Sequence, residues 1–180
     1  MLRRLLALVI VGTPVAFALD RWLARRRGPQ PPRAMDMLVV VEAPIAETWA
    51  VVADIERQPE WMHEMKRVSI TTPGAVGVGT RGEATVRIFG IGTEDPVEIT
   101  EFRPPTRFAI RHEGTFTGGG LITLEPGADG TTTIVRWTET LIPPILPELG
   151  AIVQAPILRS IFQADLHRLR RLVETGSADA

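Results

Sequence analysis

The sequence predicts an α+β domain in which a curved antiparallel sheet wraps around one long C-terminal helix. We predict this helix over Pro147 to Glu174, because apolar residues recur there at three- and four-residue spacing and therefore share one face. Most of residues 36–142 is made of short apolar or alternating segments, which is typical of strands. The expected apolar face of the helix consists of Leu149, Ile152, Val153, Ile157, Ile161, Phe162, Leu166, Leu169 and Val173.

Residues 1–24 form an apolar segment with basic flanks. Its uncharged part, Leu5 to Leu19, is shorter than the roughly 20 residues that span a bilayer. The triplet Ala16-Phe17-Ala18 resembles a signal-cleavage site, which would give an exported domain. The arginines that follow oppose export, because positive flanks tend to stay cytoplasmic. We therefore expect an uncleaved membrane anchor with the domain on the cytoplasmic side, and the alternative is export after cleavage.

An Arg- and Pro-rich linker over residues 25–35 separates this segment from the domain. Gly28-Pro29-Gln30-Pro31-Pro32 predicts a stiff, extended connection. The domain itself is expected over residues 36–174, and a disordered tail over residues 175–180.

Within the domain, the order of elements is predicted to be one strand, two short helices, about six strands and the long helix. The first strand is Met37 to Glu42, and helical spacing over Pro44 to Ile55 is followed by a second helical turn over Glu56 to Met62. The later strands are expected at 65–72, 80–89, 96–102, 107–114, 121–125 and 131–141. The sheet would thus hold about six to seven strands.

Three stretches of the sequence resemble signatures of the START-like or Bet v 1-like (SRPBCC) superfamily. They are the strand and first helix over Val39 to Trp49, the segment from Ala53 to Trp61, and the turn within Glu101 to Phe108. Within that superfamily the chain is similar to the polyketide cyclase/dehydrase and lipid transport group, over about residues 36–174. The resemblance implies a helix-grip fold with a cavity for an apolar ligand between sheet and helix. It also implies a choice of function among lipid carriers, ligand sensors, cyclases and dehydratases.

Strand alternation indicates which side chains would face such a cavity. Phe108 and Ile110 share one strand face with His112, and Trp137 shares a strand face with Glu139. Ile157 and Ile161 would face the cavity from the long helix. Trp61 should lie near the mouth, either as a gate that closes on the ligand or as an aromatic plug at the end of the sheet. The expected ligand contacts are therefore Trp61, Phe108, Ile110, Trp137, Ile157 and Ile161.

His112 and Glu139 are the titratable residues that strand phase places beside inward apolar residues. A histidine and a carboxylate facing one cavity could serve as general base and orienting acid in proton abstraction from a polyketide-like substrate. The alternative is that both lie at strand ends, where side chains reach water. A buried Glu139 would need a partner, and Arg111 or Arg136 would serve only if the register permits.

Charge and composition argue against several classes of function. Residues 34–180 hold 13 basic and 20 acidic groups, which disfavours nucleic acid as a partner. The absence of Cys excludes thiolate metal sites and Cys nucleophiles, and the three His residues show no metal-binding spacing. Gly118-Gly119-Gly120 lacks the Lys-Ser/Thr of a phosphate-binding loop, so these glycines indicate a bulge or a clear cavity floor. We expect neither a metal nor a cofactor.

Three hypotheses about function follow. The first is a membrane-tethered START-like domain that binds a lipid or other apolar small molecule in its cavity. The alternative is a cyclase or dehydratase that uses His112 and Glu139. The second alternative is a protein-interaction module whose core is filled by side chains. The sequence leaves the ligand and the oligomeric state undetermined.

Overall fold

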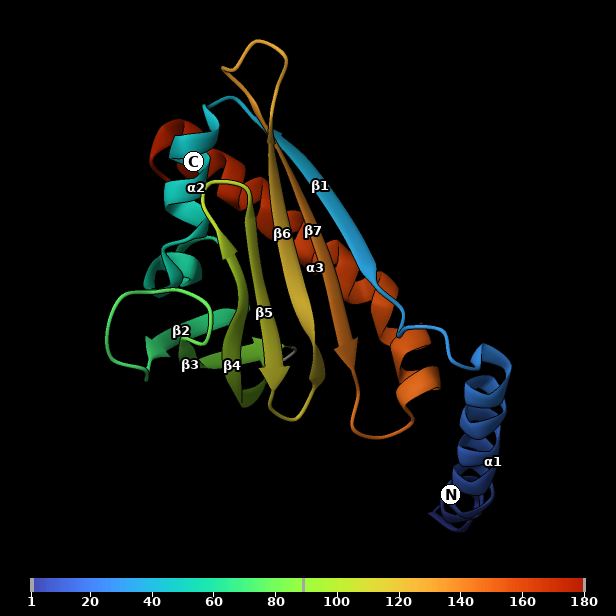
Figure 1. The fold of residues 1–180 in the computed structure, drawn as a ribbon. Helices are drawn as coiled ribbons and strands as arrows, with labels where there is room; N and C mark the ends of the chain where they lie inside the picture. Colours follow the sequence, from blue (N-terminus) through green and yellow to red (C-terminus); the bar gives the residue numbers. More distant parts are fainter. Residues whose placement is uncertain (1, 89, 180) are drawn as a thin grey trace.

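The computed structural model describes residues 2–88 and 90–179, with side chains at all of these except 2–12 and 91. Figure 1 shows one sheet, a long helix lying against it, and an N-terminal helix beside them. The elements are α1 (Leu2–Arg27), β1 (Met35–Val41), α2 (Ile45–Val52), the 3-10 helix η1 (Ile55–Glu60), β2 (Met65–Ile70), β3 (Arg81–Ile88), β4 (Ile91–Arg103), β5 (Arg107–Glu113), β6 (Thr117–Pro126), β7 (Thr133–Ile142) and α3 (Pro147–Thr175).

The seven strands form one antiparallel sheet in the order β1-β7-β6-β5-β4-β3-β2. The first strand closes onto the last, while the strands between them follow one another along the chain. The sheet curls, and α3 lies across its concave side (Figure 1). The predicted α+β fold with a curved antiparallel sheet around a C-terminal helix is therefore confirmed.

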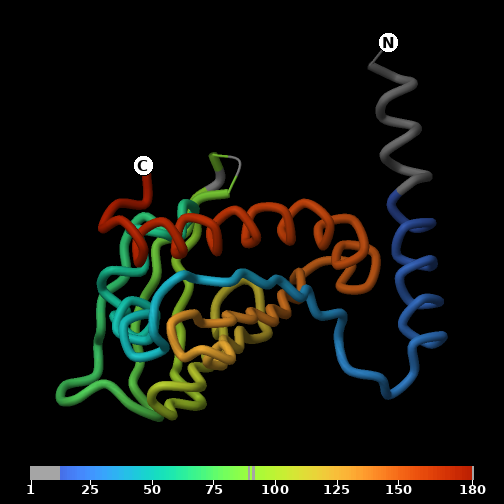
Figure 2. The backbone as a smooth tube through the Cα atoms, turned by 90° about the horizontal axis from the view of Figure 1, so that it is seen from above, coloured from blue at the N-terminus to red at the C-terminus, as the bar shows by residue number. Residues whose placement is uncertain are grey.

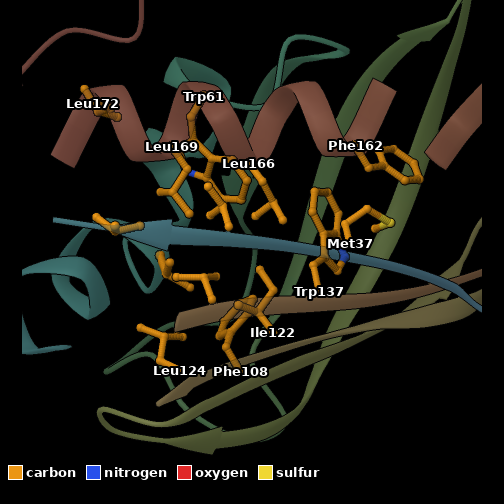
Figure 3. Packing of buried hydrophobic residues seen from close by; sticks show 14 of the residues in the cluster. Met37, Trp61, Phe108, Ile122, Leu124, Trp137, Phe162, Leu166, Leu169 and Leu172 are labelled. Atoms are coloured by element: carbon orange, nitrogen blue, oxygen red, sulfur yellow. The ribbon is translucent and has the colours of Figure 1, made fainter. Parts of the chain in front are cut away.

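The C-terminal half of α3 is the centre of the core. Leu166 and Leu169 are fully buried, and Figure 3 shows both pointing from α3 towards the sheet. Truncating either side chain to alanine would cost about 2–5 kcal/mol of stability, as is usual for buried leucines. Phe162 packs against Trp137 of β7 with their ring centroids 4.9 Å apart. This half of the helix matches the apolar stripe predicted from the sequence.

The N-terminal half of α3 departs from the predicted stripe. Ile152, Val153 and Ile157 are 38%, 62% and 45% exposed, whereas Leu158, which lay outside the predicted stripe, is buried. The prediction assumed that every apolar residue at helical spacing meets a packed sheet. Here α3 instead covers a cavity, as described below, and one side of this half faces outward.

Polar side chains of α3 form hydrogen bonds with backbone N–H and C=O groups along the outer edge of β1. Gln163 accepts a hydrogen bond from the Leu38 backbone N–H at 3.3 Å and donates one to the Leu38 carbonyl at 2.9 Å. Further along the helix, Glu174 accepts a hydrogen bond from the Glu42 N–H at 2.8 Å. An exposed sheet edge is a template for unwanted strand pairing, and here the helix occupies it.

The N-terminal helix α1 contacts the start of α3. Oδ1 of Asp20 accepts hydrogen bonds from the backbone N–H groups of Glu148 and Leu149, at 2.9 and 2.8 Å. Arg27 forms an ion pair with Glu148 at 2.7 Å. The first helical N–H groups have no partner within their own helix, so Asp20 caps α3 from another element. Figure 2 shows the described part of α1 standing beside the first turns of α3.

The predicted membrane anchor falls partly outside what the structure describes, because the side chains of residues 2–12 are not described. Within the described residues, no helix has both the length and the apolar character needed to cross a bilayer.

Two strands begin at least four residues earlier than expected, and the tail also differs from the expectation. β4 begins at Ile91, whereas the prediction began at Pro96. Pro96 lies inside the strand, opposite Glu83 of β3. β6 begins at Thr117, so the three glycines belong to the strand. Beyond α3, where a disordered tail was expected, Ala178 is only 7% exposed and its carbonyl accepts a hydrogen bond from Arg171.

Candidate functional site

A cavity of about 390 Å³ lies between the concave face of the sheet and α3. Its wall is mostly apolar and is contributed by η1, strands β2 to β7 and α3. The apolar residues from the sheet include Val68, Ala84, Val97, Ile99, Ile122 and Leu141. A cavity of this size and character can hold the apolar body of a small molecule.

The structure brings four of the six predicted ligand contacts together in the cavity wall. They are Phe108 and Ile110 of β5, Trp137 of β7 and Ile157 of α3. Because Ile157 is 45% exposed and also lines the cavity, it marks a point where the wall reaches the surface.

Trp61 and Ile161 do not line this cavity. Ile161 borders a separate surface pocket that also contains His63, His167 and Arg168. Trp61 is fully buried and packs edge-on against Trp137, with ring centroids 6.0 Å apart. Of the two roles considered for Trp61, this position fits the aromatic plug, because the ring is enclosed by core residues (Figure 3).

The polar end of the cavity is a cluster of three titratable side chains. Nδ1 of His112 lies 2.6 Å from Oδ2 of Asp95, and Nε2 of His112 lies 3.1 Å from Oε1 of Glu139. The indole N–H of Trp137 donates a hydrogen bond to the other oxygen of Glu139, Oε2, at 2.9 Å. The side chains of Asp95, His112 and Glu139 are 15%, 13% and 3% exposed, so the alternative that His112 and Glu139 reach water at strand ends is wrong.

The partners of Glu139 also differ from the expectation. The sequence left Arg111 or Arg136 as partners, but Arg111 lies on the outer face and pairs with Glu98 and Glu113. Inward-facing His112 and Trp137 take that place, because side chains of one strand alternate between the two faces of the sheet.

The surroundings of His112 favour its protonated form, the imidazolium. Burial lowers the pKa of His112, but its hydrogen bonds to Asp95 and Glu139 and their negative charges outweigh burial and raise the pKa to about 10. Both ring nitrogens then donate hydrogen bonds, and neither has a lone pair for a substrate proton. The geometry therefore does not suit His112 as a general base; it suits a proton donor or a fixed positive charge between two carboxylates.

Two glycines make room for this cluster. A Cβ atom on Gly120 would lie 2.4 Å from Oε2 of Glu139, and one on Gly114 would lie 2.6 Å from Oδ1 of Asp95. Both distances are shorter than real Cβ contacts. The sequence suggested that Gly120 could keep the cavity floor clear. In the structure, the space beside Gly120 holds the carboxylate of Glu139.

Asp95 is the site residue that sequence reasoning missed. The predicted strand began at Pro96, which left Asp95 in a turn, whereas β4 places it in the cavity wall. Strand alternation could have found it, because Asp95, Val97 and Ile99 have the same phase and all line the cavity.

A second buried carboxylate, Asp165 of α3, reaches the same cavity. It is 2% exposed, and its Oδ1 accepts a hydrogen bond from the His63 backbone N–H at 2.9 Å. Burial raises the pKa of Asp165 to about 6, although the hydrogen bond from His63 opposes this rise. Asp165 therefore changes charge close to physiological pH.

The cluster is not arranged as a metal centre. Asp95 and Glu139 bind opposite nitrogens of one imidazole ring, and in residues 2–88 and 90–179 no set of three or more His, Asp or Glu side chains could hold a metal ion.

Comparison with known proteins adds a family and a fold. The family described as polyketide cyclase/dehydrase and lipid transport matches residues 33–174. We found no significant match among curated protein sequences.

Several solved structures share the fold. The ZhuI aromatase/cyclase from Streptomyces sp. R1128 is 18% identical with a TM-score of 0.62, over 81% of this chain and 98% of that chain. A protein from Thermus thermophilus is 19% identical with a TM-score of 0.65, over 81% and 99% of the two chains. DynU16, from the dynemicin biosynthetic locus, is 24% identical with a TM-score of 0.58, over 82% of this chain and 49% of its own. At these identities the likeness concerns the fold alone.

Proposed function

The chain belongs to the polyketide cyclase/dehydrase and lipid transport family, and on that premise we propose that it binds a lipid or other apolar small molecule inside its cavity. The observation that carries this proposal is the apolar cavity of about 390 Å³ beneath α3. A filled core would have left no such space, so the cavity weighs against the protein-interaction hypothesis.

The proposal is tested with Nile red, a neutral apolar dye that fluoresces when removed from water. We expect the full chain to bind one dye molecule, and Ala84→Phe to weaken binding about tenfold or more by filling the cavity, because Ala84 is 1% exposed and lines it. The matched control is Val78→Phe, which adds the same ring at a position that is 69% exposed. Equal binding by both variants, with circular dichroism showing both folded, would place the dye on the surface and overturn the proposal.

A second candidate function is dehydration or cyclisation of a polyketide-like substrate, favoured by the cluster of Asp95, His112 and Glu139 in the cavity wall. In such a dehydration a carboxylate takes the proton from carbon and stops accepting its hydrogen bond from His112, and the N–H released in this way gives its proton to the departing hydroxyl. A carbon–carbon double bond and water form. The carboxylic acid then returns its proton to the imidazole to which it is hydrogen-bonded, which restores the starting state.

The test of this candidate is the dehydration of a cyclic β-hydroxyketone, followed by the absorbance of the conjugated product. We expect His112→Gln to abolish turnover while Nile red binding remains, because glutamine keeps a polar group but cannot give up a proton. Undiminished turnover by the His112→Gln variant, or no turnover by the unmodified protein, would exclude the mechanism.

We also propose that α1 associates with a membrane surface. Its described part exposes Val15, Phe17 and Trp22 next to several arginines, and Arg26 stacks over the Trp22 ring at 4.3 Å. Apolar and aromatic residues beside basic ones suit an anionic interface. In vesicle flotation with phosphatidylglycerol, we expect Phe17→Glu/Trp22→Glu to remain in solution and the control Val78→Glu to float; equal flotation would contradict the role of α1.

A further inference from the structure

The charged groups around the cavity are mainly acidic. In the cluster, the carboxylates of Asp95 and Glu139 surround the single imidazolium of His112, which leaves one negative charge in excess. Elsewhere, Asp165 and Glu64 also line the cavity. Arg81 is at the rim, but its side chain is 60% exposed and it pairs with Glu98 at 2.8 Å.

Part of this negative charge is uncompensated. Oδ1 of Asp95 is enclosed and has no hydrogen-bond partner among the described residues, while Oδ2 bonds to His112. Glu139 differs, because Trp137 satisfies its second oxygen. A buried carboxylate oxygen without a donor raises the free energy of the site until a positive charge or a donor comes near.

The surrounding wall makes this charge effective. Ala84, Ile99 and Phe108 line the cavity and are at most 3% exposed, so little water screens the cluster. The interaction between charges is several times stronger in such surroundings than in water. An anionic ligand group would be opposed here, and a cationic one attracted.

We propose that the natural ligand is an apolar molecule that carries a protonated amine, and that the excess negative charge centred on Asp95 selects it over carboxylic acids of the same size. This inference rests on the proposed binding function and adds the chemical class of the ligand. It orders ligands by head group: amine first, neutral alcohol second, carboxylate last. Ile110 and Trp137, which also line the cavity, would enclose the apolar part.

The test is displacement of Nile red from the full chain by dodecylamine, 1-dodecanol and dodecanoate, each below its micelle concentration at about pH 7.5. The three probes share one apolar chain, so differences in affinity report the head group. We expect the amine to bind about tenfold tighter than the alcohol or better, and dodecanoate to bind most weakly, since tenfold corresponds to only about 1.4 kcal/mol.

A pair of isosteric variants locates the charge. Asp95→Asn removes one negative charge from the cavity wall, and we expect it to lower the ratio of amine affinity to alcohol affinity about fivefold or more. The control is Glu83→Gln, which removes the same charge from an exposed position of β3 and is expected to keep the preference. An Asp95→Asn variant that retains the full preference would overturn the assignment to Asp95.

The outcomes separate this inference from the proposal on which it rests. Equal affinities of the three probes, or tightest binding of dodecanoate, would overturn the amine assignment and leave the binding function intact. Failure of all three to displace Nile red would count against the cavity as the binding site itself. The comparison of probes needs no variant, so it decides the question even if Asp95→Asn does not fold.

Discussion

Gly120 and Glu139 are directly opposite each other in the β6–β7 pair, and the carboxylate of Glu139 occupies the space that a side chain on Gly120 would fill. The oxygen concerned, Oε2, is the one that accepts the hydrogen bond from the Trp137 indole. The glycine therefore leaves room for the observed position of the Glu139 carboxylate in the polar cluster. With a methyl group at position 120, the carboxylate of Glu139 would have to shift from the position in which it bonds to His112 and Trp137.

The first prediction concerns this space. We expect Gly120→Ala to destabilise the fold by about 1–3 kcal/mol, because it would displace Oε2 of Glu139 and weaken the buried hydrogen bond from Trp137. Urea unfolding measures the change. Gly77→Ala is the matched control, because a Cβ atom there meets nothing within 4 Å. Equal stabilities of the two variants would contradict the assigned role of Gly120.

The second prediction follows from the raised pKa of His112. Its pKa is about 10 in the folded protein and about 6.5 when unfolded, so the folded state holds one extra proton between these values. The resulting stabilisation is fully present below pH 6.5 and is lost as pH rises through 10. We expect the free energy of unfolding to fall by up to about 1.4 kcal/mol per pH unit between pH 7 and 9.

This pH range is unusually free of other titrations, because the chain has no Tyr and no Cys and Lys66 is its single lysine. Urea unfolding at pH 7, 8 and 9 measures the slope, which His112→Gln should abolish. An NMR titration of the His112 ring provides a check that requires no variant. A ring that loses its proton near pH 6.5 would show that the cluster does not hold an imidazolium.

Most of the fold could be predicted from the sequence because its determinants are local. The stripe containing Phe162, Leu166 and Leu169 has helical period, and the alternation through Phe108 and Ile110 is that of a half-buried strand. The family resemblance supplied the cavity between the sheet and the helix, which no local pattern contains. Ile157 shows what helical spacing cannot predict. Apolar residues have the same spacing whether the helix packs against a filled core or covers a cavity.

The candidate site could be predicted only in part. Phase along two strands placed His112 and Glu139 on the same side of the sheet, but their contact depends on register between β5, β6 and β7. Asp95 was hidden by Pro96, because a proline usually argues against the interior of a strand. The protonation of His112 could not be predicted either, since it depends on having both carboxylates within hydrogen-bonding distance.

The third prediction concerns the contact between α1 and α3. We expect Asp20→Ala to destabilise the first turn of α3 by about 1 kcal/mol, because the N–H groups of Glu148 and Leu149 would lose their acceptor. Hydrogen exchange of these two amides should then be about fivefold faster. Arg21→Ala, at the exposed neighbouring position, is the control. Unchanged exchange in Asp20→Ala would mean that α1 does not cap α3 in solution.

The fourth prediction concerns Asp165, which is buried in α3 and is held by one backbone N–H. Its pKa is about 6 when folded and about 3.8 when unfolded, so stability related to this group is present below pH 3.8 and lost as pH rises through 6. Asp165→Asn keeps an oxygen for the His63 N–H but cannot acquire a charge. We expect it to stabilise the protein by about 1–3 kcal/mol at pH 7.5. At pH 4, where the folded wild type already holds the proton, the gain should nearly vanish.

Asp36→Asn, at an exposed position of β1, should show no such pH dependence. A stabilisation that is the same at both pH values would indicate that the amide improves packing and that Asp165 is not an ionised buried acid at neutral pH.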